Sequence, residues 1–155
     1  MKRNKIYLFI ISILFIYSCG EDKLVEFDVD LPNNAGTILA YMVQFYPNGI
    51  LRYVEVVSGQ QINYNGQTIY PKQISYYQSE NYQRIIIDSK YIEITVAGNT
   101  IKGKDVSFYD ASKKVESIFF ASEQEKIPID MDDGSIKEAG IYVKYNENGK
   151  GLEAN

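Results

Sequence analysis

Residues 37–57 read TILAYMVQFYPNGILRYVEVV, two largely apolar segments separated by the tripeptide Pro47-Asn48-Gly49. Pro fixes φ near the value that a turn needs, and Gly adopts positive φ without steric cost, so this tripeptide predicts a tight turn. The segments on either side, 37–46 and 50–57, are rich in the β-branched and aromatic residues that strands favour. The stretch therefore predicts a β-hairpin.

Apolar and polar residues alternate in the same way elsewhere along the chain. A period of two predicts a strand with one buried side and one solvent-facing side. In the first such strand, Glu26, Asp28 and Asp30 are expected to face water. The apolar sides of three such strands are Val25, Phe27, Val29 and Leu31, then Ile92, Ile94 and Val96, and finally Ile141, Val143 and Tyr145.

Turn signals separate these segments at roughly 8 to 15 residues, a spacing that suits an antiparallel meander. The predicted fold class is all-β: a single antiparallel β-sandwich or small barrel with meander hairpins, formed by residues 24–155. Only residues 122–139 are expected to carry a helical turn, and Pro128 and Gly134 argue against a long helix there. The predicted strands are 24–31, 37–46, 50–57, 61–64, 67–78, 83–88, 91–97, 101–109, 114–121 and 140–145.

The chain begins with the cations Lys2, Arg3 and Lys5, and an apolar run follows over residues 6–17, interrupted only by Ser12. A helix that spans a bilayer needs about 20 apolar residues, so this run is too short. A charged start followed by a short apolar run is the layout of a secretory signal peptide. The sequence therefore predicts a signal peptide over residues 1–18.

Residues 16–19, Ile-Tyr-Ser-Cys, resemble the lipobox of bacterial lipoprotein precursors, with an aliphatic residue at −3 and a small residue at −1. The resemblance implies that Cys19 becomes the lipidated first residue of the mature protein, carrying diacylglycerol and a further acyl chain such as palmitate. Residues 19–23 then form the lipidated Cys and a short tether to the membrane. In lipoproteins of this kind, Gly20 in place of Asp implies sorting to the outer membrane. The acidic pair Glu21-Asp22 resembles signals for the cell surface, and both the periplasmic and the surface-exposed side stay open.

The composition excludes several kinds of active site. The chain has no His and one Cys, which excludes a Ser-His-Asp or Cys-His apparatus, a thiolate metal cluster and an internal disulfide. Residues 1–18 hold three of the 16 basic residues and none of the 20 acidic ones, so their removal moves the formal charge from −4 to about −7. An acidic chain without a cluster of Lys and Arg is repelled by nucleic acid. We therefore expect no enzyme, no cofactor and no nucleic-acid partner.

An acidic segment near the C-terminus is a candidate cation site. Its composition is similar to that of a calcium loop, but Gly134 stands fifth from the first acid, whereas the EF-hand loop has its Gly sixth. We interpret the segment as a solvated acidic turn and therefore expect no metal. The weak candidate ligands are Asp130, Asp132, Asp133 and Glu138.

Tyrosines are the second candidate. The chain has 14 of them, and Tyr76, Tyr77 and Tyr82 flank one predicted hairpin. Exposed Tyr rings bind sugars and peptide segments by stacking and apolar contact, so the three form a candidate aromatic binding surface. Half-buried residues of a sheet are the alternative interpretation.

A short pattern occurs three times: Val43-Gln44-Phe45-Tyr46-Pro47-Asn48-Gly49, Val106–Ser112 and, in part, Tyr145–Lys150. An aromatic strand end that leads into an Asn-Gly-type turn resembles the hairpin repeats called MORN-like. It is also similar to the elongated β-folds of periplasmic lipopolysaccharide-transport proteins. The intervals of 63 and about 36 residues do not fit a single period, and ordinary hairpin chemistry is the alternative explanation.

Three functions are compatible with these observations. The leading hypothesis is a lipid-anchored, extracytoplasmic β domain that is not an enzyme and that binds a protein or glycan partner or supports the cell envelope. The second is an envelope component that handles or transports lipid, which needs an apolar cavity. The third is an inhibitor or immunity lipoprotein against a hydrolase, because an acidic surface suits a basic target enzyme.

Overall fold

A computed structural model describes residues 24–122 and 124–155, which form strands and one short 3-10 turn, η1 (Pro32–Asn34). The predicted signal peptide, lipobox and tether, residues 1–23, lie outside this part of the chain. Within the described ranges no helix is long and apolar enough to cross a membrane. The strands are β1 Phe27–Asp30, β2 Thr37–Phe45, β3 Leu51–Val56, β4 Ile62–Tyr64, β5 Gln67–Tyr76, β6 Tyr82–Ser89, β7 Ile92–Val96, β8 Asn99–Phe108, β9 Val115–Phe120, β10 Ile127–Asp130, β11 Ile136–Ala139, β12 Tyr142–Tyr145 and β13 Gly151–Ala154.

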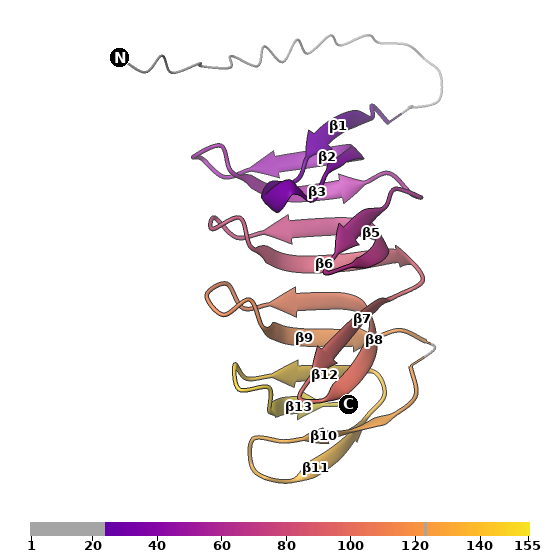
Figure 1. The fold of residues 1–155 in the computed structure, drawn as a ribbon, viewed down its shortest axis with the longest axis vertical. Helices are drawn as coiled ribbons and strands as arrows, with labels where there is room; N and C mark the ends of the chain where they lie inside the picture. Colours follow the sequence, from indigo (N-terminus) through magenta and orange to yellow (C-terminus); the bar gives the residue numbers. More distant parts are fainter. Residues whose placement is uncertain (1–23, 123) are drawn as a thin grey trace.

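The strands follow one another in four units of the same design, which we call repeats 1 to 4. Each repeat has a short strand, a first turn (turn A), a long strand, a second turn (turn B) and a return strand. Repeat 1 is β1-β2-β3, repeat 2 is β4-β5-β6 and repeat 3 is β7-β8-β9. In repeat 4 the short strand is β10, the long strand is broken into β11 and β12, and β13 returns. The four turn-B loops lie in one column along the molecule (Figure 1).

The long and return strands build one antiparallel sheet in the order β1-β2-β3-β5-β6-β8-β9-β12-β13. The predicted all-β antiparallel fold is confirmed. The two outer strands, β1 and β13, are the edges of this path and do not pair with each other. The sheet is therefore open and, of the two predicted closures, the small barrel is not formed, whereas the arrangement is consistent with a sandwich.

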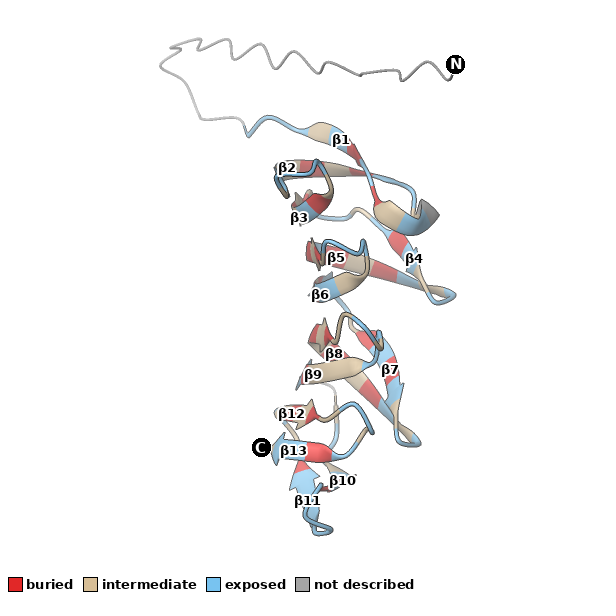
Figure 2. Cartoon of the chain, turned by 90° about the vertical axis from the view of Figure 1, so that its left-hand side faces the viewer, coloured by how far each residue is buried: buried red, intermediate tan, exposed pale blue. Residues whose placement is uncertain are grey.

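A second, smaller layer lies on one side of the main sheet, where β4 and β7 are visible in Figure 2. The long strands belong to both layers: Gln67–Ile69 of β5 pair with β4, and Tyr70–Tyr76 pair with β6. Register shifts mark the crossing in β2, β5 and β8. Such bulges bend a strand, and the bend lets one strand serve two layers.

The core lies between the layers and forms one hydrophobic cluster that runs through all four repeats. Its centre is a row of β-branched residues paired across neighbouring strands of the main sheet, all of them 0% exposed. Burial of each such side chain contributes roughly 1.5–3 kcal/mol, so this row is the main apolar contact along the stack. Its members are Val54, Ile74, Ile85, Val106, Ile118 and Val143.

The predicted sides of the strands are confirmed in the middle of each strand and wrong at two ends. Phe27, Val29 and Leu31 pack on the core, while Val25 is 76% exposed because β1 begins only at Phe27. Ile141 is 63% exposed because it lies in the break between β11 and β12. The stretch 122–139, the one place where the sequence left room for a helical turn, holds the hairpin β10–β11.

Turn B carries a hydrogen bond that ties each repeat to the next one. A Tyr hydroxyl at the start of the turn donates to the backbone carbonyl at the equivalent place in the following repeat. The bonds run from the Tyr46 hydroxyl to the Tyr76 carbonyl (2.9 Å), from Tyr77 to Phe108 (2.9 Å) and from Tyr109 to Tyr145 (2.7 Å). In repeat 4, the last repeat of the described residues, Asn146 stands where the other three repeats have this Tyr.

The recurring aromatic turn thus marks a repeat, and the interval of 63 residues spans two repeats. The turn between them, Tyr77 to Asn81, contains neither Pro nor Gly. Glu80 takes the left-handed conformation there, at φ 66°, which Gly49 takes in repeat 1 at φ 82°. A hairpin was predicted here, but it was not recognised as a further copy of the pattern, because its backbone geometry is retained without the residues that usually signal it.

Candidate functional site

Turn A of one repeat meets turn B of the next, and we call each such meeting a seam. The seam between repeats 1 and 2 is closed by a hydrogen bond in which Asn33 Nδ2 donates to the Glu80 carbonyl at 2.9 Å. At the seam between repeats 3 and 4, Gly149 packs against turn A. A Cβ placed on Gly149 would lie 3.7 Å from Val96 and 3.8 Å from Ala97. The first of these seams is therefore closed by a direct hydrogen bond, while at the second the turns leave room for a single Cβ and border the groove described next.

The seam between repeats 2 and 3 is the centre of an open groove of about 520 Å³. A smaller hollow of about 210 Å³ shares four of its lining residues and continues it toward repeat 1. We call the two together the seam groove. Its principal lining residues are Tyr64, Asn65, Thr95, Val96, Phe108 and Lys113.

The groove coincides with a longer turn B in repeat 3. In repeats 1, 2 and 4, the hydrogen bond that closes the turn encloses three residues. In repeat 3 it joins the Tyr109 amide to the Lys114 carbonyl at 2.9 Å and encloses four. The additional residue brings Lys113 to the groove wall in the left-handed conformation, at φ 56°. A one-residue insertion into an otherwise regular array therefore accompanies the opening.

Aromatic rings form the floor of the groove. The ring of Tyr64 lies 5.5 Å from that of Tyr82 and 6.0 Å from that of Phe108, separations typical of favourable aromatic pairs. Burial, followed by the neighbouring Tyr82, raises the pKa of Tyr64 to about 12. The hydroxyl of Tyr64 therefore stays neutral at physiological pH and presents a hydrogen-bond donor together with an apolar ring.

The walls of the groove carry charge on both sides. Lys113 and Lys114 line it from turn B of repeat 3, and Glu93 lines it from β7. Lys114 Nζ also donates to the Glu147 carbonyl at 2.8 Å, which holds its ammonium group between the turn-B loops of repeats 3 and 4. Asn65 and Asn148 add side-chain amides at the rim. The groove thus combines stacking faces, hydrogen-bonding groups and two ammonium groups.

The three tyrosines proposed as an aromatic surface do not form one surface: Tyr76 and Tyr82 are in contact, and Tyr77 lies apart from them. Tyr76 is 0% exposed and its ring lies 5.2 Å from that of Tyr82, so both belong to the inner side of the sheet. Tyr77 follows in the chain and faces the outer side, where it lines a small hollow with Arg84. Only Tyr82 reaches the seam groove. Nothing local in the sequence indicated that the turn Asn65-Gly66, beside Tyr64, meets Lys113.

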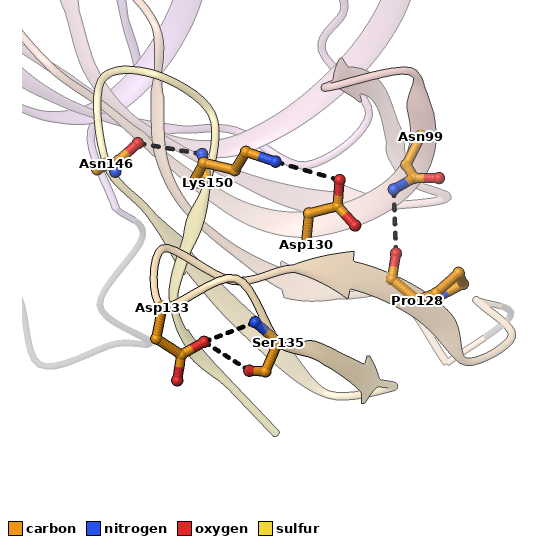
Figure 3. Close-up of polar contacts among 7 residues, drawn as sticks. All are labelled: Asn99, Pro128, Asp130, Asp133, Ser135, Asn146 and Lys150. Carbon is orange, nitrogen blue, oxygen red and sulfur yellow. Dashed lines mark hydrogen bonds and ion pairs between the residues drawn. The ribbon is translucent and has the colours of Figure 1, made fainter.

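The acidic candidates are spread over separate contacts (Figure 3). Asp130 pairs with Lys150 at 3.2 Å, and Asp132 Oδ1 accepts a hydrogen bond from Asn146 Nδ2 at 2.6 Å. Asp133 Oδ1 accepts from the Ser135 hydroxyl at 2.6 Å and from the Ser135 amide at 2.9 Å, which lowers the pKa of Asp133. Glu138 lies on β11 opposite Pro128. No three His, Cys, Asp or Glu side chains among the described residues are grouped so that they could hold a metal ion.

No protein-family model, curated protein or solved structure matches this chain. Its candidate site is therefore interpreted from its own geometry. The seam groove brings together residues mainly of repeats 2, 3 and 4, with Asn33 of repeat 1 at one end, and the side chains on its surface supply binding functions: aromatic faces, amides and ammonium groups. A groove of this volume lies within the usual range of ligand sites, about 300–1,000 Å³.

Proposed function

We propose that the protein is a lipid-anchored, non-enzymatic binding module of the cell envelope, and that the seam groove holds part of its partner. The observation that carries the proposal is the open seam between repeats 2 and 3. The seam between repeats 1 and 2 is closed by a direct hydrogen bond, whereas this one leaves Tyr64 and Phe108 at the floor of a groove. A local departure from a regular design is expected where a function requires it.

The scaffold supports a binding role. Aromatic residues dominate the energy of most interfaces when they lie in a central pocket, and the groove floor provides Tyr64, Tyr82 and Phe108. Strand pairing and the tyrosine bonds between repeats fix the turns that line the groove. A rigid site loses little conformational entropy when it binds.

The position of the groove agrees with anchoring through Cys19. Four residues, 20–23, separate that Cys from the described chain and reach at most about 14 Å. Repeat 1 is then nearest to the membrane, and the stack extends away from it in chain order (Figure 1). The groove lies beyond repeat 1, between repeats 2, 3 and 4, where a partner reaches it more easily than at the membrane surface.

The lining of the groove favours a partner with polar groups over an acyl chain. Glu93, Asn65, Asn148 and two lysines line it, and an acyl chain has no group that pairs with them. Neither the lipid-handling function nor the inhibitor function gains support from a particular contact of the groove. We therefore retain the binding module as the proposed function.

A photo-crosslinking amino acid at position 113 of the full-length lipoprotein tests this proposal in its own cells. We expect an adduct that the second-site variant Asn148→Arg reduces at least several-fold, because the larger side chain enters the groove from an exposed rim position. The same crosslinker at Lys137, an exposed residue of β11, is the matched control. Adducts that are absent, or equal at both positions and insensitive to Asn148→Arg, would contradict the proposal.

A further inference from the structure

We propose that the bound part of the partner is an extended, acidic peptide segment that adds to the free edge of β7. This inference rests on the proposed function of the seam groove and specifies the chemistry of its occupant. It depends on the backbone of β7, on a side chain that already imitates a paired strand, and on the charge at the groove mouth.

β7 is bonded to another strand on one side only. It pairs with β8 from Ile92 opposite Gly103 to Val96 opposite Asn99. On the other side, Glu93 uses both of its backbone groups: its amide donates to Gln67 Oε1 at 2.9 Å, and its carbonyl accepts from Gln67 Nε2 at 2.6 Å. Since backbone direction repeats every two residues in a strand, the amide and carbonyl of Thr95 point to the same edge.

The Gln67 side chain makes the two hydrogen bonds that the backbone N–H and C=O of one residue in a neighbouring antiparallel strand would make. A carboxamide and a peptide group present the same donor and acceptor. The Gln67 contact therefore shows that this edge of β7 accepts such a pair at normal hydrogen-bond distances. Thr95 is the next position along the edge, and it lines the seam groove. Its backbone groups have no further partner among residues 24–122 and 124–155.

The other edges of the structure are less suited to accept a strand. On β1, the exposed acids Asp28 and Asp30 discourage pairing with another chain. On β13, the Gly151 carbonyl already accepts a hydrogen bond from the Asp132 amide at 2.8 Å. β7 carries one exposed acid, Glu93, whose backbone groups are already bonded to Gln67, and the next edge position, Thr95, is uncharged. Addition of a strand to such an edge is a common mode of peptide recognition, with backbone bonds giving affinity and pockets giving specificity.

The surroundings of Thr95 indicate what the peptide carries. Side chains of a paired strand alternate, so every second one faces the groove floor at Tyr64 and Phe108 and is expected to be apolar. Lys113 and Lys114 stand at the mouth and complement a negative charge. A peptide that alternates apolar and polar residues and carries at least one Asp or Glu therefore fits this groove.

Selection of displayed 12-residue peptides on the full-length lipoprotein in detergent tests the inference. Thr95→Pro removes the outward amide without removing a bond to β8, and Pro is tolerated at an edge strand when its nitrogen faces outward. We expect selected peptides to bind Thr95→Pro about tenfold more weakly, in line with the loss of one hydrogen bond. The matched control Thr95→Val keeps the backbone and is expected to bind within about threefold. Lys113→Glu should weaken the binding of acidic peptides.

A second measurement keeps the test valid if Thr95→Pro does not fold. N-methylation of single backbone amides in a selected peptide, assayed on the unchanged protein, should abolish binding at alternate positions only. Peptides that are not enriched, or that bind independently of Thr95 and of N-methylation, would overturn the inference. If position 113 crosslinks a protease-resistant glycan, the proposed function stands and the peptide inference falls. If neither an adduct nor a peptide is found, both fall.

Discussion

The tyrosine hydroxyls of this array fall into two groups, one hydrogen-bonded and one not. The hydroxyls of Tyr46, Tyr77 and Tyr109 each bond to a carbonyl of the next repeat. The hydroxyls of Tyr76 and Tyr145 are buried and find no hydrogen-bond partner within residues 24–122 and 124–155. The first group therefore contributes to the contact between repeats, whereas the second leaves a polar atom unsatisfied in the core.

Removal of a tying hydroxyl should destabilise the protein. Tyr109→Phe deletes the bond to the Tyr145 carbonyl, and we expect the free energy of unfolding to fall by about 0.5–1.5 kcal/mol in urea denaturation. Tyr142→Phe is the matched control, since Tyr142 stacks on Phe119 on the outer face and no hydrogen bond of its hydroxyl is found among the described residues. Equal losses for the two variants would contradict a specific role of the tie.

Removal of an unsatisfied hydroxyl should have the opposite sign. The position of Tyr145 is occupied in repeat 3 by Phe108, which is buried as Tyr145 is, so the fold accepts a buried Phe there. Tyr145→Phe removes a buried oxygen without a partner, and we expect a gain of about 1 kcal/mol in the free energy of unfolding at neutral pH. A loss as large as that of Tyr109→Phe would indicate that the hydroxyl has a partner.

The buried tyrosines also predict a loss of stability at high pH. Burial raises the pKa of Tyr64 and of Tyr145 to about 12, from an ordinary value of 10.0. Above pH 10 the unfolded chain releases these protons while the folded chain retains them, so the free energy of unfolding falls as the pH rises from 10 to 12. In Tyr64→Phe this decline should be shallower, as measured by urea midpoints at several pH values. Parallel pH curves for the two proteins would contradict the buried position of Tyr64.

At the scale of the strands, close packing of the long strands on their neighbours explains a glycine. A Cβ on Gly103 would lie 2.9 Å from Cγ2 of Ile118 and 2.9 Å from Cγ2 of Val106, both in the central core row. We expect Gly103→Ala to lower the free energy of unfolding by about 1–3 kcal/mol through overpacking. Ser107→Ala, on the outer side of the same strand, is the control and should change it by less than about 0.5 kcal/mol.

The strands show how far sequence reasoning reaches. Strands such as 37–46 and 67–78 were predicted because alternation and turn residues are local signals, and the structure places strands there at Thr37–Phe45 and Gln67–Tyr76. β10, β11 and β13 were missed because they are short and sit beside Pro128, Gly134 and Gly149. The groove was missed for a different reason. Tyr64 and Lys113 meet only through the stacking of repeats, which no local pattern encodes.

The whole molecule is a linear stack, so its stability should vary along the stack. In repeat proteins each unit contacts only its neighbours, and an inner unit is therefore held from two sides while an end unit is held from one. The described sheet agrees with this: β5, β6 and β8 each lie between two strands of the main path, and β1 pairs with β2 alone. Local opening is expected to begin at the ends.

Native-state hydrogen exchange measures this gradient directly. We expect the slowest amide exchange in β5, β6 and β8, whose residues Ile74, Ile85 and Val106 lie in the central core row. The fastest should be in β1 and in the separate hairpin β10–β11. The Thr95 amide faces the free edge of β7, so it should exchange faster than the amide of its neighbour Ile94, which faces β8. Uniform exchange along the chain would instead mean that the four repeats unfold as one cooperative unit.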